Sequence, residues 1–268
     1  MTTTESDPRG AAAAKLIDAL AAGDPDGVRA LFSGPAEIDD PFAGRHVDGG
    51  FERTVRAWRP VQGATVEDAE VTSSTTQGRF NGTEITLRLA REDGRVELPI
   101  VVVSEHAEDG RIERSRLYYR RARIDGRQHH RWPILDSQGT FVLNEALAAY
   151  QKALREGDVE GMMATFGPDF HFDGHGQSQD LDEGLGMGRY DREQTRAALV
   201  QMFGLNPQGG ATIEHLNVID DGTTTVLEFN LHQGVPEDPQ VRAHAGVACY
   251  ELGAGGLIKE ARVYDEAW

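Results

Sequence analysis

Several features that would mark a particular class of protein are scarce or missing in this chain of 268 residues. Its single cysteine, Cys249, excludes an internal disulfide and a zinc site built from cysteines. No apolar run approaches the ~20 residues that cross a bilayer, so we expect no membrane span. Residues 1–10 are polar and lack the apolar core of a secretory signal, which favours a cytoplasmic location. The composition, 39% apolar and 26% charged, is that of a globular protein.

Positive charge is also scarce, and its distribution is uneven. Residues 1–134 carry 19 basic and 22 acidic side chains, whereas residues 135–268 carry 8 and 22, which gives net charges of −3 and −14. An acidic surface repels phosphate backbones and anionic lipid, so we expect neither nucleic acid nor a membrane as partner. The basic stretch from Arg111 to Arg131 alternates with apolar residues without interleaved stacking aromatics, which is typical of a solvated strand face.

The chain repeats itself. Leu16–Gly27 matches Tyr150–Gly161 at an offset of 134, and Gly110–Glu113 matches Gly256–Lys259 at an offset of 146. The difference of twelve residues is the size of an insertion, which we place in the glycine-rich segment Gly174–Gly188. The sequence therefore predicts two copies of one unit, over residues 10–124 and 139–268, joined by a linker over 125–138.

Each copy carries the pattern of three helices and a run of antiparallel strands, which predicts an α+β fold with a curved sheet. In the first copy we expect helices over Ala11–Ala22, Asp24–Phe32 and Phe51–Trp58, and strands over Ala36–Asp40, Thr65–Thr72, Thr83–Arg91, Val96–His106 and Ile112–Arg121. In the second we expect helices over Phe141–Arg155, Asp158–Phe166 and Asp191–Phe203, and strands over Asp169–Asp173, Ala211–Ile219, Thr223–His232, Val241–Glu251 and Leu257–Tyr264.

The order helix, Gly-Asp, helix, then Ile38-Asp39-Asp40-Pro41-Phe42 and a closing Gly110-Arg111-Ile112 strand resembles the SnoaL-like and ketosteroid-isomerase-like branch of the nuclear transport factor 2-like superfamily. The resemblance covers both copies. It implies two tandem cone-shaped domains, each with three helices packed on a curved antiparallel sheet, arranged as an intramolecular pseudo-dimer. Association into a larger homo-oligomer stays open.

The resemblance also implies a small hydrophobic or polyketide-like substrate and no cofactor. It leaves three functions open, because fold alone does not determine activity. The first is a biosynthetic polyketide cyclase or isomerase that uses a cavity carboxylate as general acid and base. The second is an epoxide hydrolase or ring-opening cyclase with an Asp–Glu pair, and the third is a non-catalytic ligand-binding protein.

In the first copy, Asp40 matches the position of the family's catalytic base. Strand alternation supports this assignment, since Ile38 and Asp40 share one face. The two positions that carry oxyanion donors in the family hold Leu16 and Val102 here. Glu67, at the start of the first long strand, would be the partner of Asp40 in an Asp–Glu pair like that of the tandem epoxide hydrolases.

The second copy keeps the family's tyrosine but lacks the family's base. Tyr150 stands where the family has its tyrosine, but Gly174 takes the position of the base and Gly246 that of the third polar residue. Asp173 lies one residue before the base position. It is therefore either a surface residue or, with a bulge at Gly174, a base that turns into the cavity.

Two further groups of residues are candidates for binding. His171, Asp173 and His175 lie on one strand face and have the ligand types of a facial triad for a metal ion. The sequence identifies no rigid ligand on another element that would complete such a site, so we predict no metal. Aromatic side chains are expected to line or plug the cones: Trp58, Tyr118, Tyr119, Phe172, Phe229 and Tyr264. The substrate contacts that we select are Trp58, Tyr118, Phe172, His244 and Tyr264.

Overall fold

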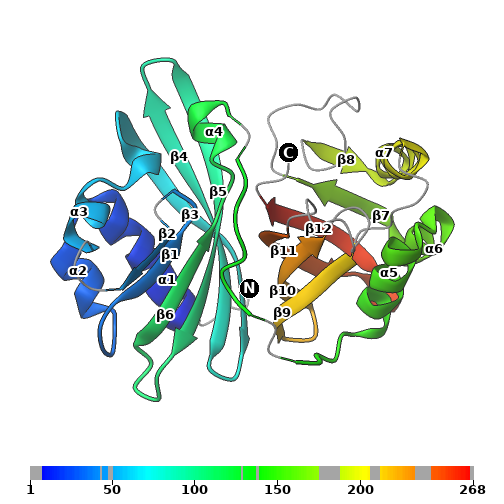
Figure 1. Ribbon diagram of the computed structural model, residues 1–268, viewed down its shortest axis with the longest axis horizontal. Coiled ribbons are helices and arrows are strands. Elements are labelled where there is room, and N and C mark those ends of the chain that lie inside the picture. The colour runs from blue at the N-terminus through cyan, green and yellow to red at the C-terminus, as the bar shows by residue number, and fades with distance from the viewer. Residues whose placement is uncertain are drawn as a thin grey trace, which may run out of the picture. The chain divides into compact units, whose positions relative to one another are not determined.

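The chain forms two compact units, Met1–Arg127 and Gln128–Trp268, in the computed structural model (Figure 1). The structure describes residues 8–42, 44–47, 51–127, 129–136, 139–174, 188–205, 212–232 and 243–265. Each unit combines helices with one six-stranded sheet, which confirms the predicted α+β class. No helix in the described part of the chain has the length and apolar character needed to cross a membrane.

In the first unit three helices precede the long strands, and a short fourth helix follows them. The helices are α1 (Pro8–Ala21), α2 (Pro25–Ala30), α3 (Phe51–Arg56) and the short α4 (Ala122–Asp125), with a 3-10 turn at Arg59–Val61. The strands are β1 (Glu37–Asp40), β2 (Gly44–Val47), β3 (Ala64–Gln77), β4 (Phe80–Arg91), β5 (Gly94–His106) and β6 (Ile112–Tyr118).

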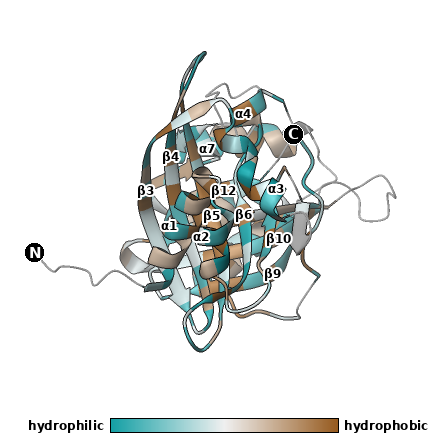
Figure 2. Ribbon diagram, turned by 90° about the vertical axis from the view of Figure 1, so that its left-hand side faces the viewer, coloured by the Kyte–Doolittle hydropathy of each residue, from teal (hydrophilic) through white to brown (hydrophobic). Residues whose placement is uncertain are grey.

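The sheet of the first unit has the order β2-β1-β6-β5-β4-β3, and α1 and α2 cover one of its faces (Figures 1 and 2). Alternate residues of β4 and β5 point at these helices and are fully buried, for example Leu87 and Ile100. From α1, Leu16 and Ile17 complete this core. Burying such side chains stabilises the fold by about 1.5–3 kcal/mol each, so this interface holds the helices on the sheet.

The second unit repeats the arrangement. Its helices are α5 (Glu145–Glu156), α6 (Val159–Ala164) and α7 (Arg192–Leu205), with a 3-10 turn at Ala254–Gly256. Its strands are β7 (Phe166–Asp173), β8 (Arg189–Asp191), β9 (Thr212–Asp220), β10 (Thr224–His232), β11 (His244–Leu252) and β12 (Ile258–Asp265). They follow the order β8-β7-β12-β11-β10-β9, which is the order of the first sheet.

The second helix of each unit begins in the same way. Asp24 accepts from the backbone N–H of Gly27 at 3.0 Å, and Asp158 accepts from that of Gly161 at 2.9 Å. Each aspartate thus caps its helix by satisfying an N–H group that has no partner within the helix. Both glycines are required by the cap, since a Cβ at either one would lie within 2.4 Å of the capping carboxylate.

Three details differ from the sequence prediction. Each sheet contains one parallel pair, β1 with β6 and β7 with β12, among otherwise antiparallel neighbours. After Pro41 the chain returns as β2, which pairs with β1 through Asp40 and Gly44. Residues 189–191 form strand β8, so the following helix begins at Arg192 instead of Asp191. Short edge strands of three or four residues carry little periodicity, which is why the sequence does not reveal them.

Candidate active site

Asp40 is the last residue of β1 and is buried, with 2% of its surface exposed. Its Oδ2 accepts hydrogen bonds from the hydroxyl of Tyr119 at 2.6 Å and from the indole Nε1 of Trp58 at 3.0 Å. Its Oδ1 accepts from the backbone N–H of Phe42 at 2.8 Å. The carboxylate is therefore fixed by donors from three separate parts of the unit.

These contacts show which atoms around Asp40 donate hydrogen bonds and which accept them. An indole N–H can only donate, so the oxygen that faces Trp58 must accept. The distance of 2.6 Å from Tyr119 lies in the range of a charge-assisted bond between a hydroxyl and a carboxylate. The rings of Trp58 and Tyr119 meet edge to face, with centroids 6.3 Å apart, and this packing limits the movement of both donors. The site thus holds a preoriented carboxylate.

Asp40 also lines a pocket of about 370 Å³. The other lining residues come from α3 and the segment that follows it, and they are Arg53, Thr54, Ala57, Trp58 and Arg59. Beside this site the guanidinium of Arg121 lies 4.2 Å from the centre of the Phe42 ring, a cation–π contact that supports the turn after Asp40. A buried acid therefore faces a space in which a small molecule fits.

The two family positions for oxyanion donors are filled by apolar core. Leu16 and Val102 are both completely buried in the cluster between α1 and the sheet. Neither can donate a hydrogen bond to a ligand. The polar groups next to Asp40 come from Trp58 and Tyr119 instead, on other elements of the unit.

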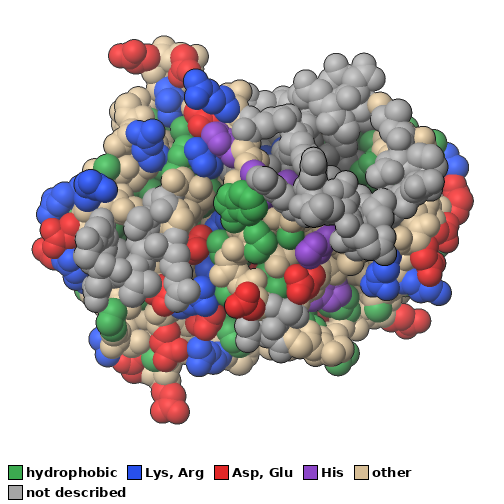
Figure 3. All heavy atoms as spheres, in the orientation of Figure 1, with side chains coloured by type: hydrophobic (Ala, Val, Ile, Leu, Met, Phe, Trp, Pro, Cys, Tyr) green, Lys and Arg blue, Asp and Glu red, His purple; other side chains and the backbone are tan. Residues whose placement is uncertain are grey.

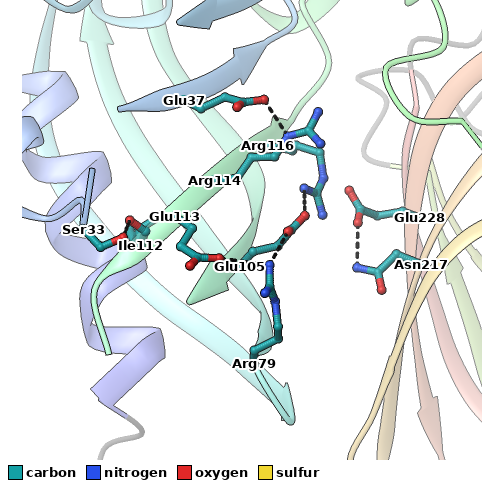
Figure 4. Close-up of polar contacts among 10 residues, drawn as sticks. All are labelled: Ser33, Glu37, Arg79, Glu105, Ile112, Glu113, Arg114, Arg116, Asn217 and Glu228. Atoms are coloured by element: carbon teal, nitrogen blue, oxygen red, sulfur yellow. Dashed lines mark hydrogen bonds and ion pairs between the residues drawn. The ribbon is translucent and has the colours of Figure 1, made fainter. Parts of the chain in front are cut away.

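The tyrosine that contacts Asp40 is Tyr119, whereas the sequence predicts Tyr118 as a substrate contact. Leu117 and Tyr119 belong to the helix-facing core, so Tyr118 points to the opposite face of the sheet. That face carries a polar network in which buried Arg116 binds Glu105 at 2.6 Å (Figure 4). Tyr118 and Asp40 therefore lie on different faces of the sheet, because a one-residue step along a strand reverses the face.

Glu67 lies apart from Asp40. It is on the edge strand β3, is exposed, and pairs with Arg95 at 3.1 Å. It is also absent from the lining of the pocket that contains Asp40. The structure therefore does not bring together the expected Asp40–Glu67 pair. Edge strands expose alternate residues to water, which explains the position of this glutamate.

In the second unit the strand register places Asp173 away from the equivalent site. Asp39 pairs with Arg116 between β1 and β6, and Asp173 pairs with Arg262 between β7 and β12. Asp173 is thus the counterpart of Asp39, and Gly174 is that of Asp40. The Asp173 carboxylate lies 3.7 Å from Arg189 in an ion pair.

The register also shows which residue replaces Tyr119. Tyr118 pairs with Val101, and Tyr264 pairs with Val247. Tyr119 therefore corresponds to Asp265, which is 8% exposed. At these two positions the second unit therefore has Gly174 where the first unit has Asp40, and Asp265 where the first unit has Tyr119.

The same register corrects the third family position. Val102 corresponds to Ala248, whereas the sequence alignment placed Gly246 there. Gly246 lies opposite Phe229, and a Cβ at Gly246 would be 2.6 Å from the Phe229 ring. The glycine leaves room for this aromatic side chain in the core.

Tyr150 lies among aromatic rings of the second core. Its ring centroid is 5.5 Å from that of Phe166 and 6.0 Å from that of Tyr250. Burial raises the pKa of Tyr150 to about 12, so its hydroxyl stays protonated at neutral pH. Phe172 is also part of this core and packs on Tyr190, with centroids 6.3 Å apart.

The other selected residues of the second unit lie on different faces. His244 is buried, and its ring centroid is 4.5 Å from that of His130. Burial, and then His130, lower the pKa of His244, although Asp265 acts in the opposite direction. Tyr264 is buried and follows the orientation of Tyr118, on the face opposite Asp265.

The histidine cluster of β7 is only partly described. The Nδ1 of His171 lies 2.9 Å from the backbone oxygen of Asp169, and His175 falls outside the described residues, as does most of the segment Gly174–Gly188. Within the described ranges, no three His, Cys, Asp or Glu side chains gather in a way that could hold a metal.

Residues 147–261 match the family model of the SnoaL-like domain, so the second unit contains a SnoaL-like domain and the predicted family is confirmed there. An NTF2-like protein of unknown function from Cytophaga hutchinsonii is 14% identical, over 48% of this chain and 93% of its own, with a TM-score of 0.34. A putative polyketide cyclase from Sinorhizobium meliloti is 14% identical, over 45% and 94%, with a TM-score of 0.34. A LEH-like epoxide hydrolase from M. tuberculosis is 20% identical, over 45% and 79%, with a TM-score of 0.34. No curated protein sequence matches the chain.

Proposed function

We propose that the first unit is an acid–base catalyst of the polyketide cyclase or isomerase type, acting on a small apolar carbonyl compound. The observation that carries this proposal is the position of Asp40, which is buried, faces a pocket and is held by Trp58 and Tyr119. A general base needs a fixed acceptor within reach of the proton it removes. The hydrogen bonds from Trp58 and Tyr119 fix such an acceptor, Asp40, in the wall of the pocket.

In this reaction the Asp40 carboxylate takes a proton from the carbon next to the substrate carbonyl. The electrons of the broken C–H bond form the C=C bond of an enolate, whose oxygen takes the negative charge. In an isomerase, Asp40 returns the proton to a different carbon. In a cyclase, the enolate carbon attacks a second carbonyl of the same molecule, and the new alkoxide takes the proton from Asp40.

A second function is favoured by one specific observation. Leu16 and Val102 leave no hydrogen-bond donor at the two positions where the family stabilises an enolate oxygen. A pocket without such donors suits a protein that binds a small molecule and does not convert it. The epoxide hydrolase reaction with an Asp–Glu pair has no corresponding support, since Glu67 pairs with Arg95.

The test is proton exchange into a small bicyclic ketone, 2-tetralone, dissolved in D₂O and followed by proton NMR. We expect the protein to accelerate loss of the signals next to the carbonyl, and Asp40→Asn to lower this rate by about 10²–10⁴-fold, the usual contribution of a general base. Tyr119→Phe keeps the carboxylate but loses one donor, so its rate should fall less.

Asp173→Asn is the control in the second unit: it makes the same chemical change at the acid next to the position equivalent to Asp40, and it should keep the full rate. Exchange that depends on Asp173 and not on Asp40 would contradict the assignment of the active unit. Binding of the ketone without accelerated exchange would instead support the non-catalytic function.

A further inference from the structure

We propose that the pocket at Asp40 takes an anionic ligand, with Arg53 and Arg59 binding a carboxylate at the end of the ligand that lies away from Asp40. This inference rests on the proposed function, because it names the class of substrate for the same pocket. It goes beyond that function, because acid–base chemistry on a carbonyl compound does not itself require a charged substrate.

The first observation is the composition of the pocket wall. Of its six lining residues, two are arginines, and both belong to the exposed side, whereas Asp40 and Trp58 are buried. A guanidinium is planar and presents paired N–H donors that match the two oxygens of a carboxylate. The pocket therefore has a buried acid on one side and carboxylate-binding groups on the other.

The second observation is how the nearby charges are paired. Glu52 binds Arg29 at 2.8 Å, and Arg29 also contacts Asp26, so these acids are already engaged. Among the residues that the structure describes, Arg53 makes no ion pair and Arg59 only donates to the neutral Gln62, at 3.2 Å. The charges of the two pocket arginines are thus not neutralised by described acids.

The third observation is the contrast with the whole chain, which carries a net charge of −17. Segment 51–59 holds Arg53, Arg56 and Arg59 against the single acid Glu52. In the space-filling view, blue basic side chains lie next to red acidic ones along the edge of the first unit where α2 and α3 lie (Figure 3). A basic pocket mouth on an acidic protein draws anions to that place, since local potential steers charged ligands.

The experiment compares two ligands of nearly equal shape, 2-naphthoate and its neutral analogue 2-naphthamide, by isothermal titration calorimetry. We expect naphthoate to bind about fivefold more tightly, the upper end of the change in an equilibrium constant that one exposed ion pair produces. The preference should fall below about twofold in the Arg53→Gln/Arg59→Gln variant. It should also weaken when the salt concentration is raised from low to high, because salt screens exposed charges.

Arg95→Gln is the control. It removes the same charge from an exposed arginine of the first unit that does not line the pocket, and it should keep the preference. Equal affinity for the two ligands, no binding of naphthoate at millimolar concentration, or a preference that survives the double substitution would overturn the inference.

The experiments distinguish a failure of the catalytic proposal from a failure of the anion-binding proposal. If Asp40→Asn leaves ketone exchange intact while the naphthoate preference still depends on the two arginines, the catalytic function is wrong and the anion site stands. If exchange depends on Asp40 and the preference is absent, the catalyst stands and its substrate is neutral.

Discussion

The two units share an architecture but differ in the residues at the two positions that hold Asp40 and Tyr119 in the first unit. In the first unit Asp40 ends β1 and meets Tyr119, which follows β6. In the second unit the same two positions hold Gly174 and Asp265. Strand order and helix caps are the same in both, so the fold depends on the core and the caps. The polar residues of the site are not part of that requirement and can move between strands.

The units also differ in the side chains that titrate near neutrality. The first unit contains two of the nine histidines, and the second contains seven. Two of the latter, His215 and His244, have a pKa lowered first by burial. The candidate chemistry of the first unit therefore centres on one carboxylate. The second unit holds partly buried histidines whose protonation lowers the stability of the fold.

The largest difference in stability between equivalent substitutions in the two units is expected at Gly246. Gly246→Ala places a methyl group against the Phe229 ring, and we expect a loss of about 1–3 kcal/mol from overpacking. The equivalent residue of the first unit, Ile100, already carries a side chain, and Ile100→Val should cost only about 1 kcal/mol. Hydrogen–deuterium exchange measured on peptides of each unit reports the two losses separately. An unchanged exchange rate in Gly246→Ala would mean that Phe229 moves aside without cost.

A smaller and equal effect is expected at the helix caps. Asp24→Ala and Asp158→Ala each remove the acceptor for the first free N–H groups of their helix, at a cost of about 1 kcal/mol. Urea denaturation together with peptide exchange measures each loss in its own unit. The free-energy changes of two distant substitutions usually add to within about 0.5 kcal/mol. A larger difference between the two losses would show that the two caps are not equivalent.

The smallest effect concerns pH. A histidine whose pKa is lowered in the folded state binds fewer protons than in the unfolded state below about pH 6.5, so stability falls as the pH falls through that range. Once the intrinsic slowing of amide exchange at lower pH is corrected for, we expect increased exchange in peptides of the second unit as the pH falls from 7.5 to 5. His244→Gln should reduce that increase. The same increase in the variant would assign the sensitivity to other groups.

Much of the fold could be predicted from local patterns. Asp24 and Gly27, repeated as Asp158 and Gly161, predict the start of a helix from neighbouring residues alone. Strand alternation places Asp40 on the same face as Ile38, and Asp40 is indeed buried, at 2% exposure. The short strands β2 and β8 escaped prediction because they are defined by pairing and not by periodicity.

Less of the candidate site could be predicted, because its residues are also brought together by strand pairing and not by local pattern. Tyr119 was among the expected cone aromatics, yet sequence alone did not separate it from Tyr118. Glu67 matched a family role by position, but its strand lies at the edge of the sheet and its carboxylate turns to Arg95. The sequence alignment assigns the third family position to Gly246, whereas the strand register assigns it to Ala248, two residues further along the strand.

The sequence by itself determined the start of the second helix of each unit and its cap, because these depend on residues within a few positions of one another, and its matches at offsets of 134 and 146 residues predicted the two similar units. The tertiary structure alone decided that Tyr119 and Trp58 hold that acid and that Asp265 replaces Tyr119 in the second unit. The hydrogen bond from Tyr119 to Asp40 spans 79 residues. Contacts of this kind are set by strand register, in which a shift of one residue reverses every side chain.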